Sequence, residues 1–253
     1  MPRRACLRVT GDEATHFLQN LVTCEIEALG PGDLTFGALL TPQGKVLFDF
    51  FVLREAEGYL FDTPAEARDA LRQRLAFYKL RAAVAVEDDA RGVVTGEGLA
   101  PDPRSPALPG RGYEDGPEAI DASYDAARIE AGVPEAGLDY AYGEVFPHDA
   151  GFDRYARPGA GVAFRKGCYV GQEVVSRMQH RGTARRRPIV LEFDAAVPTG
   201  AAVMADEREI GTVGTVAGEA ALAIVRLDRA ESAGRLTVDG VEARWKPSPL
   251  LAA

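Results

Sequence analysis

The sequence predicts an α+β fold that ends in a small β-barrel. Residues 10–21 and 63–78 repeat apolar side chains at helical spacing, and the bulky apolar runs between them are typical of strands. After Pro188 the pattern changes to short strands separated by turns. Asp239–Gly240 is a strong hairpin signal in this last part, and few strands with many glycines favour a barrel over a sandwich.

The remaining elements follow from local signals. A turn at Pro42–Gly44 should precede a strand, and further strands are expected at 58–63, 82–88 and 92–96. Proline and glycine crowd residues 98–117, which predicts a loop or a junction between domains. A helix is expected next, stopped by Gly132 and Pro134.

Composition and charge exclude some classes of protein. The 253 residues are 46% hydrophobic and 26% charged, as in a soluble globular protein, and we find no apolar stretch of the roughly 20 residues that a membrane helix needs. The net charge of −9 argues against binding of nucleic acid by the whole surface. Residues 165–187 depart from this, because they carry seven basic side chains and one acid.

The cysteines indicate a reducing environment. Cys6, Cys24 and Cys168 are far apart and form no CxxC pair, so neither a metal site nor a disulfide framework is expected. The first residues include two arginines but no long apolar region typical of a secretory signal. We therefore expect a cytoplasmic protein.

The segment Lys166–Gly182, KGCYVGQEVVSRMQHRG, predicts a tight turn that leads into a helix. Cys168 would precede the helix N-terminus, where unpaired N–H groups and Lys166 favour a thiolate or a bound carboxylate. Arg177 and Arg181 would add bidentate donors. Two plainer interpretations stay open: a cysteine that fills the core, and arginines that form a solvated face.

The run KGCYVGQE closely resembles the signature of the YgfZ-type folate-binding proteins, and further blocks resemble that family along most of the chain. These proteins are similar in fold to the glycine-cleavage T-protein. The resemblance implies three modules around a central folate channel. We expect residues 1–40 and 118–187 to form one module, 41–117 a second, and 188–253 the C-terminal β-barrel.

The resemblance also implies a function: a tetrahydrofolate-binding accessory protein for iron–sulfur cluster assembly or repair, with a link to tRNA modification. The cofactor would be tetrahydrofolate or a one-carbon derivative, and the partners client iron–sulfur proteins or their assembly machinery. Glu130 matches the acid that faces the pterin, and Cys168 would be a functional thiol at the channel mouth. The other implied folate-binding residues are Lys166, Tyr169, Gln172, Glu173, Arg177 and Arg181.

The chain departs from the T-protein pattern at two places. Phe48–Asp49 stands where the T-protein has two adjacent acids, and Asp149 and Gly151 alter a segment on the pterin side. The first departure weakens a second hypothesis, a folate-dependent aminomethyl or one-carbon transferase that uses Asp49. A third hypothesis is an RNA-binding module that uses the arginines between Arg177 and Arg187.

Overall fold

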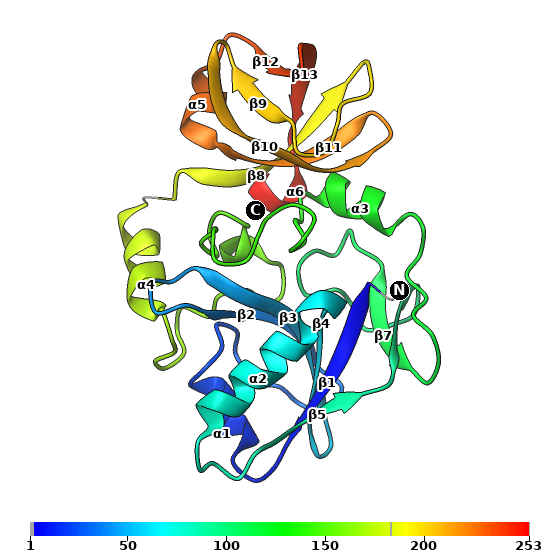
Figure 1. Ribbon diagram of the computed structural model, residues 1–253, viewed down its shortest axis with the longest axis vertical. Helices are drawn as coiled ribbons and strands as arrows, with labels where there is room; N and C mark the ends of the chain where they lie inside the picture. Colours follow the sequence, from blue (N-terminus) through cyan, green and yellow to red (C-terminus); the bar gives the residue numbers. More distant parts are fainter. Residues whose placement is uncertain (1–2, 183, 253) are drawn as a thin grey trace.

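The computed structural model describes residues 3–182 and 184–252. Along the long axis of the molecule, a sheet with helices forms one end and a closed barrel forms the other (Figure 1). The α+β fold with a C-terminal barrel is therefore confirmed. Within the described residues, no helix is long and apolar enough to cross a membrane.

The larger sheet has five antiparallel strands in the order β2-β3-β4-β1-β5. Its strands are β1 (Arg4–Thr10), β2 (Leu34–Leu40), β3 (Val46–Glu55), β4 (Gly58–Pro64) and β5 (Ala85–Asp89). Strands β1 and β2 come from the predicted first module, and the other three from the predicted second module. The division into these modules stays a prediction, and the backbone pairing runs across their boundary.

The two faces of this sheet bury different partners, because successive side chains of a strand point to opposite sides. Phe48 and Phe50 of β3 pack toward α1 (Ala14–Gln19) and α2 (Arg68–Lys79). Phe51 packs on the other face, against the long segment after α3 (Tyr124–Ala131). This alternation sends Asp49 to the same face as Phe51 and away from its neighbour Phe48.

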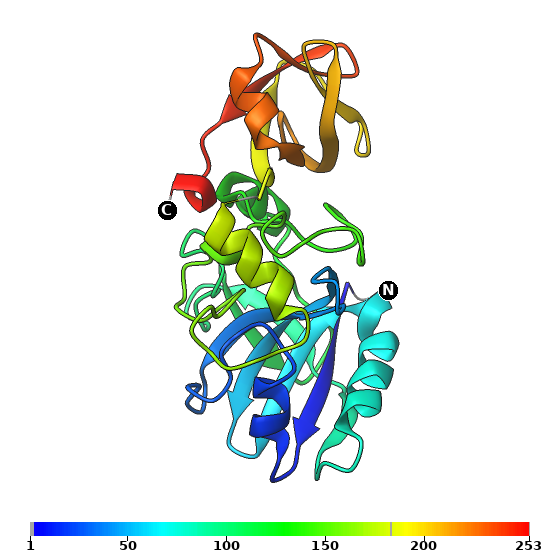
Figure 2. The ribbon, with the colours of Figure 1, turned by 90° about the vertical axis from the view of Figure 1, so that its left-hand side faces the viewer.

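Shorter elements connect the sheet to the barrel. A hairpin of β6 (Gly92–Gly96) and β7 (Gly110–Glu114) precedes α3, which ends at the left-handed residue Gly132 as predicted. One short 3-10 turn leads into α2, and a second lies beyond α3 (Ala65–Ala67 and Phe152–Arg154). Helix α4 (Gln172–Arg181) is the helix predicted in the signature, and it lies beside the sheet in Figure 2.

The barrel closes in the order β10-β11-β8-β13-β12-β9. Its strands are β8 (Arg186–Phe193), β9 (Ala202–Ala205), β10 (Arg208–Ala217), β11 (Ala220–Arg226), β12 (Leu236–Val238) and β13 (Val241–Lys246). Asp239 and Gly240 both adopt positive φ between β12 and β13, so the predicted hairpin is confirmed. Helix α5 (Leu227–Ser232) follows β11, and α6 (Pro249–Ala252) ends the described chain near α3.

Candidate functional site

The loop at residues 166–171, which precedes α4 and which we call the signature loop, is held to the segment between α1 and β2 by contacts with backbone atoms. Lys166 donates from Nζ to the carbonyl oxygens of Val22, at 2.8 Å, and of Cys24, at 2.6 Å. A Cβ on Gly171 would come within 2.6 Å of the Thr41 carbonyl oxygen, and φ there is +79°. Glycine is therefore required where the loop turns into α4. The ammonium group of Lys166 anchors this loop, in contrast to the expectation that it acts on the Cys168 thiol.

The other residues of the signature divide between surface and core. Cys168 is a free, exposed thiol, whereas the ring of Tyr169 is buried in the main core. Glu173 and Arg177 form an exposed ion pair one helical turn apart, and Gln172 donates weakly to the Gly167 carbonyl, at 3.4 Å. Arg181 is exposed at the end of α4. The signature segment therefore exposes a thiol and a polar helix face to solvent, and the buried ring of Tyr169 anchors the segment in the core.

Asp49 is buried on the inner face of the sheet. Both of its carboxylate oxygens accept hydrogen bonds, from the Tyr140 hydroxyl and, at 2.7 Å, from the Tyr142 hydroxyl. Burial raises the pKa of Asp49, and the two hydroxyls and Arg4 offset this in part.

Glu130 occupies a different environment from Asp49. Its side chain is 74% exposed on α3, and Lys246 Nζ of the barrel lies 3.9 Å from it. Its neighbours Arg128 and Ile129 are buried, because successive helical residues are rotated by about 100°. The structure does not bring Glu130, Asp49 and Cys168 together around one cavity, and the role of each stays a prediction.

The departures at Asp149 and Gly151 serve the local backbone. Asp149 accepts a hydrogen bond from the Phe146 N–H at 3.0 Å, which closes a turn. Gly151 has φ of +75° and starts the turn at Phe152–Arg154. The neighbouring His148 is buried, and its Nε2 lies 3.1 Å from Gln179 Oε1 of α4. This segment therefore ties the signature helix to the core.

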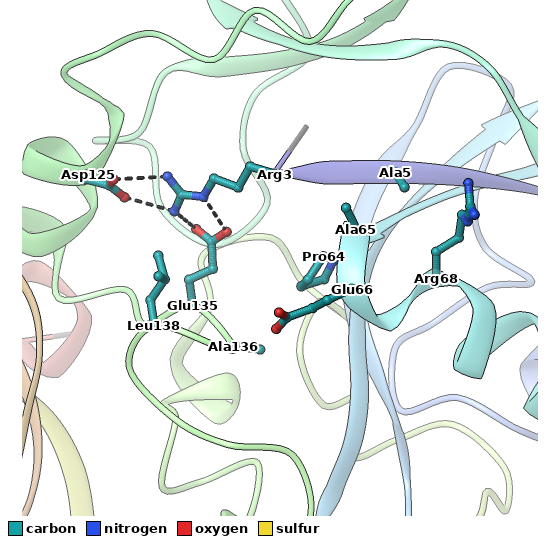
Figure 3. A pocket seen from close by; sticks show the side chains of 11 residues that line it. Arg3, Ala5, Pro64, Ala65, Glu66, Arg68, Asp125, Glu135, Ala136 and Leu138 are labelled. Atoms are coloured by element: carbon teal, nitrogen blue, oxygen red, sulfur yellow. Dashed lines mark hydrogen bonds and ion pairs between the residues drawn. The ribbon is translucent and has the colours of Figure 1, made fainter. Parts of the chain in front are cut away.

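A cavity of about 660 Å³ opens where β1, the start of α2, α3 and the segment after α3 meet. Figure 3 shows the charged side chains around it, with Arg3 between Asp125 and Glu135. Glu66 and Arg68 line the opposite side. The cavity is within the size range of sites for small molecules and cofactors, and it has both carboxylates and guanidinium groups on its walls.

Glu135 is the buried carboxylate of this cavity. Its Oε2 lies 2.6 Å from Arg3 Nη2 and 3.4 Å from Arg128 Nε, and its Oε1 is 3.5 Å from Arg4 Nη1. Burial by itself would raise the pKa of Glu135, but Arg4, Arg128 and Arg3 together lower it to about 2. Sequence patterns do not point to Glu135, because it follows Pro134 in an aperiodic segment and belongs to no motif.

Asp62 is a second buried carboxylate, and it shares Arg4 with Glu135. Asp62 of β4 accepts from Arg4 Nε at 2.7 Å and from Arg111 Nε at 2.6 Å, and all three side chains are buried. Burial opposes ionisation of Asp62, but Arg111 and Arg4 lower its pKa. These pairs link β4 to β1 and to the β6–β7 hairpin.

Asp139 connects the barrel to the rest of the chain. Its Oδ2 accepts from Arg128 Nη1 at 2.6 Å, and its Oδ1 accepts from the Thr215 N–H at 2.7 Å. Arg128 Nη2 in turn donates to Thr215 Oγ1 at 2.6 Å. Gly214 leaves room for this contact, since a Cβ there would lie 2.8 Å from Asp139 Cα. These bonds fix the barrel relative to α3 and to the segment after α3 that lines the cavity.

Comparisons with known proteins agree with this architecture. Residues 185–250 match the family model described as the CAF17 C-terminal beta-barrel domain. Over the whole chain the fold is similar to the glycine cleavage system aminomethyltransferase T from Bartonella henselae, with a TM-score of 0.78 at 16% identity. That match covers 98% of this chain and 84% of the other, and at this identity it shows the fold.

Sequence relatives carry a functional name. An iron–sulfur cluster assembly factor IBA57 homologue of Mycosarcoma maydis is 30% identical over 230 residues, covering 76% of this chain and 56% of that protein. The homologue of Pyricularia oryzae is 31% identical over 267 residues, covering 92% and 66%. Human IBA57 is 27% identical over 239 residues, covering 78% and 66%. The matches therefore span between about half and two thirds of these relatives.

The expected cytoplasmic location is corrected by the same comparison, because these relatives are named as mitochondrial proteins. Sparse, unpaired cysteines report a reducing environment and do not distinguish one reducing compartment from another. The YgfZ resemblance holds at the coarser level of fold and likeness to assembly factors. The chain has a glycine-cleavage T-protein-like fold with a C-terminal barrel of the CAF17 type, and most of its length is similar to IBA57 iron–sulfur cluster assembly factors.

Proposed function

We propose that this chain is a folate-binding accessory factor for the assembly or repair of iron–sulfur clusters. The observation that carries the proposal is the similarity over 76% and 92% of the chain to two proteins named as iron–sulfur cluster assembly factors. Its partners would be the assembly machinery or client iron–sulfur proteins. The link to tRNA modification implied by the YgfZ resemblance would then run through clients of this kind.

The cavity beside Glu135 has features that suit a reduced folate. The T-protein-like fold supports a site between modules, and a volume of about 660 Å³ can hold a cofactor of this size. Glu66 could pair with the donor edge of the pterin, and Arg68 with a carboxylate of the glutamate tail. Gly137 has φ of +81°, and a Cβ there would lie 2.7 Å from Glu66 Oε1, so glycine keeps space around this carboxylate.

We favour a binding role over one-carbon transfer. Asp49 is held by two tyrosine hydroxyls, and Phe48, in place of the second T-protein acid, is buried on the opposite face of the sheet. RNA binding by the arginine run also has less support. Arg177 pairs with Glu173, and Arg187 pairs with Asp153 at 2.6 Å.

Folate binding predicts a specific pattern of affinities. Glu66→Gln and Arg68→Ala should each weaken tetrahydrofolate about tenfold, because a charged hydrogen bond contributes roughly 1.5–3 kcal/mol. Arg74→Ala is the matched control, since Arg74 lies on the exposed face of the same helix and does not line this cavity. Titration calorimetry measures all three. Equal affinities in the cavity variants and the control would remove the site, and a loss caused by Glu130→Ala instead would place the pterin at α3.

The accessory role predicts a separate effect of the exposed thiol. Cys168→Ser should keep the melting temperature and the folate affinity of the unchanged protein, because the Cys168 side chain is exposed and does not pack in the core. The variant should nevertheless fail to restore iron–sulfur enzyme activity in cells that lack their own assembly factor. Asp194→Asn, an exposed change in the barrel region, should restore activity fully. Full rescue by the serine variant would show that the thiol is dispensable.

A further inference from the structure

Two apolar side chains at the end of α2 lie in solvent. Phe77 is 67% exposed and Leu80 is 82% exposed, while Leu71 and Leu75 form the buried face of the same helix. The fold therefore does not need the first two as core residues. Single exposed apolar side chains are common, but neighbouring ones that form a patch often mark a site of interaction with another molecule.

A cavity of about 330 Å³ lies at the end of α2 and is lined by Tyr78 and Lys79, the residues between Phe77 and Leu80 in the chain. Its apolar lining comes from α1, the end of α2 and the signature loop, and consists of Phe17, Leu21, Tyr78, Ala82 and Val170. The Phe77 ring contacts the Tyr78 ring edge-on, with centroids 5.7 Å apart. We call Phe77, Leu80 and this neighbouring cavity the Phe77 surface; Figure 1 shows α1 near the same end of α2.

The backbone of Leu80 is strained. This residue has φ of +48° and ψ of −105°, a conformation that suits glycine and that L-residues with a Cβ rarely adopt. A leucine here incurs the strain and also exposes its side chain. Strained residues of this kind cluster at ligand-binding and switch regions.

Two exposed basic side chains flank the Phe77 surface, in a chain whose net charge is −9. Among the charged residues that line its cavity, Lys79 is basic and Glu13 is acidic, and Glu13 accepts a hydrogen bond from the Ala83 N–H. Arg74, one turn before Phe77, and Arg81, next to Leu80, are both exposed. An occupant that complements this surface must present apolar side chains flanked by carboxylates.

We propose that the Phe77 surface binds an acidic amphipathic helix of a partner protein. Apolar side chains of that helix would cover Phe77 and Leu80 and enter the cavity, and its acids would meet Arg74 and Arg81. A helix suits this surface better than a lipid bilayer does. A protruding row of side chains can fill the cavity, whereas a bilayer presents a flat face, and the net charge of −9 disfavours anionic lipids.

This proposal rests on the proposed function, because the partner would be a protein of the iron–sulfur assembly machinery or one of its clients. Val170 lines the cavity and stands two residues after Cys168, whose thiol is exposed. A helix bound here would bring its protein next to the signature loop. The docking site is distinct from the folate cavity, since the two cavities share no lining residue.

The test uses the full chain and synthetic helical peptides of 18 residues. One peptide has leucine on one face and glutamate on the other; a second has lysine in place of glutamate. Fluorescence anisotropy should show binding of the acidic peptide and much weaker binding of the basic one. Phe77→Ser and Leu80→Ser should each weaken the acidic peptide about fivefold or more. Leu138→Ser, a change at an exposed leucine on the cavity near Glu135, should have no effect.

Leu80→Gly separates a docking role from a structural one. Glycine relieves the positive φ, so this variant should melt at the same or a higher temperature while it loses peptide affinity. Unchanged affinity in Phe77→Ser and Leu80→Gly would overturn the proposal, and so would equal binding of both peptides, or binding of anionic phospholipid vesicles without the acidic peptide. Calorimetry with tetrahydrofolate on Phe77→Ser and Leu80→Gly should give wild-type affinity, so failure of the folate proposal is recognised separately.

Discussion

Replacing Asp62 by alanine should lower the free energy of unfolding by about 3–5 kcal/mol, because it leaves two buried arginines without their shared carboxylate. Arg4 and Arg111 each donate to a different oxygen of Asp62, at 2.7 and 2.6 Å, and none of the three side chains is more than slightly exposed. Neither guanidinium can lose its proton to escape this environment. Urea unfolding followed by circular dichroism measures the loss.

Asp69→Ala is the control for this prediction. Asp69 also pairs with an arginine, Arg68, at 3.1 Å, but both side chains are well exposed. Solvent screens such a pair, so the change should cost less than about 1 kcal/mol. If Asp62→Ala cost no more than Asp69→Ala, the buried pairs would not hold the sheet to the hairpin.

The second large effect is expected at Asp139. Asp139→Ala should cost about 3 kcal/mol, since it removes the closest carboxylate of the buried Arg128, which keeps only the more distant Asp125 and Glu135, and it removes the acceptor of the Thr215 N–H. The loss should fall on the contact between barrel and α3. In the variant, the barrel should therefore melt separately from the rest of the chain.

The sequence provides a probe for this separation. Trp245, in β13 of the barrel, is the sole tryptophan of the chain, so its fluorescence reports on the barrel while circular dichroism reports on all elements. The two melting curves should coincide in the unchanged protein and diverge in Asp139→Ala. Asp194→Ala, which removes an exposed ion pair with Arg244 within the barrel region, should keep them together. Coincident curves in both variants would contradict a docking role for Asp139.

Local patterns in the sequence predicted several elements correctly. Helix α4 lies between the two left-handed glycines, Gly171 and Gly182, that the motif places at its ends. The hairpin at Asp239–Gly240 follows from the ability of these residues to adopt positive φ. Such signals act over a few residues, so a single sequence contains them in full.

The candidate cavity could not be predicted in this way, because its contacts join distant parts of the chain. Glu135 pairs with Arg3, which is 132 positions away, and Asp62 with Arg111, which is 49 positions away. Neither carboxylate sits in a motif. Period and propensity describe neighbours along a strand or a helix, and they do not say which strand meets which loop.

By itself, the sequence determined the α+β class, the C-terminal barrel and the turn that presents Cys168, because backbone preference and apolar spacing act locally. Tertiary structure decided which charges became buried partners. It exposed Glu130 on the outer side of α3, buried Asp49 beneath two tyrosines, and gathered Arg3, Arg4 and Arg128 around Glu135. The physical reason is that a side chain's charge state and accessibility depend on what packs against it, and packing is fixed when all the elements assemble.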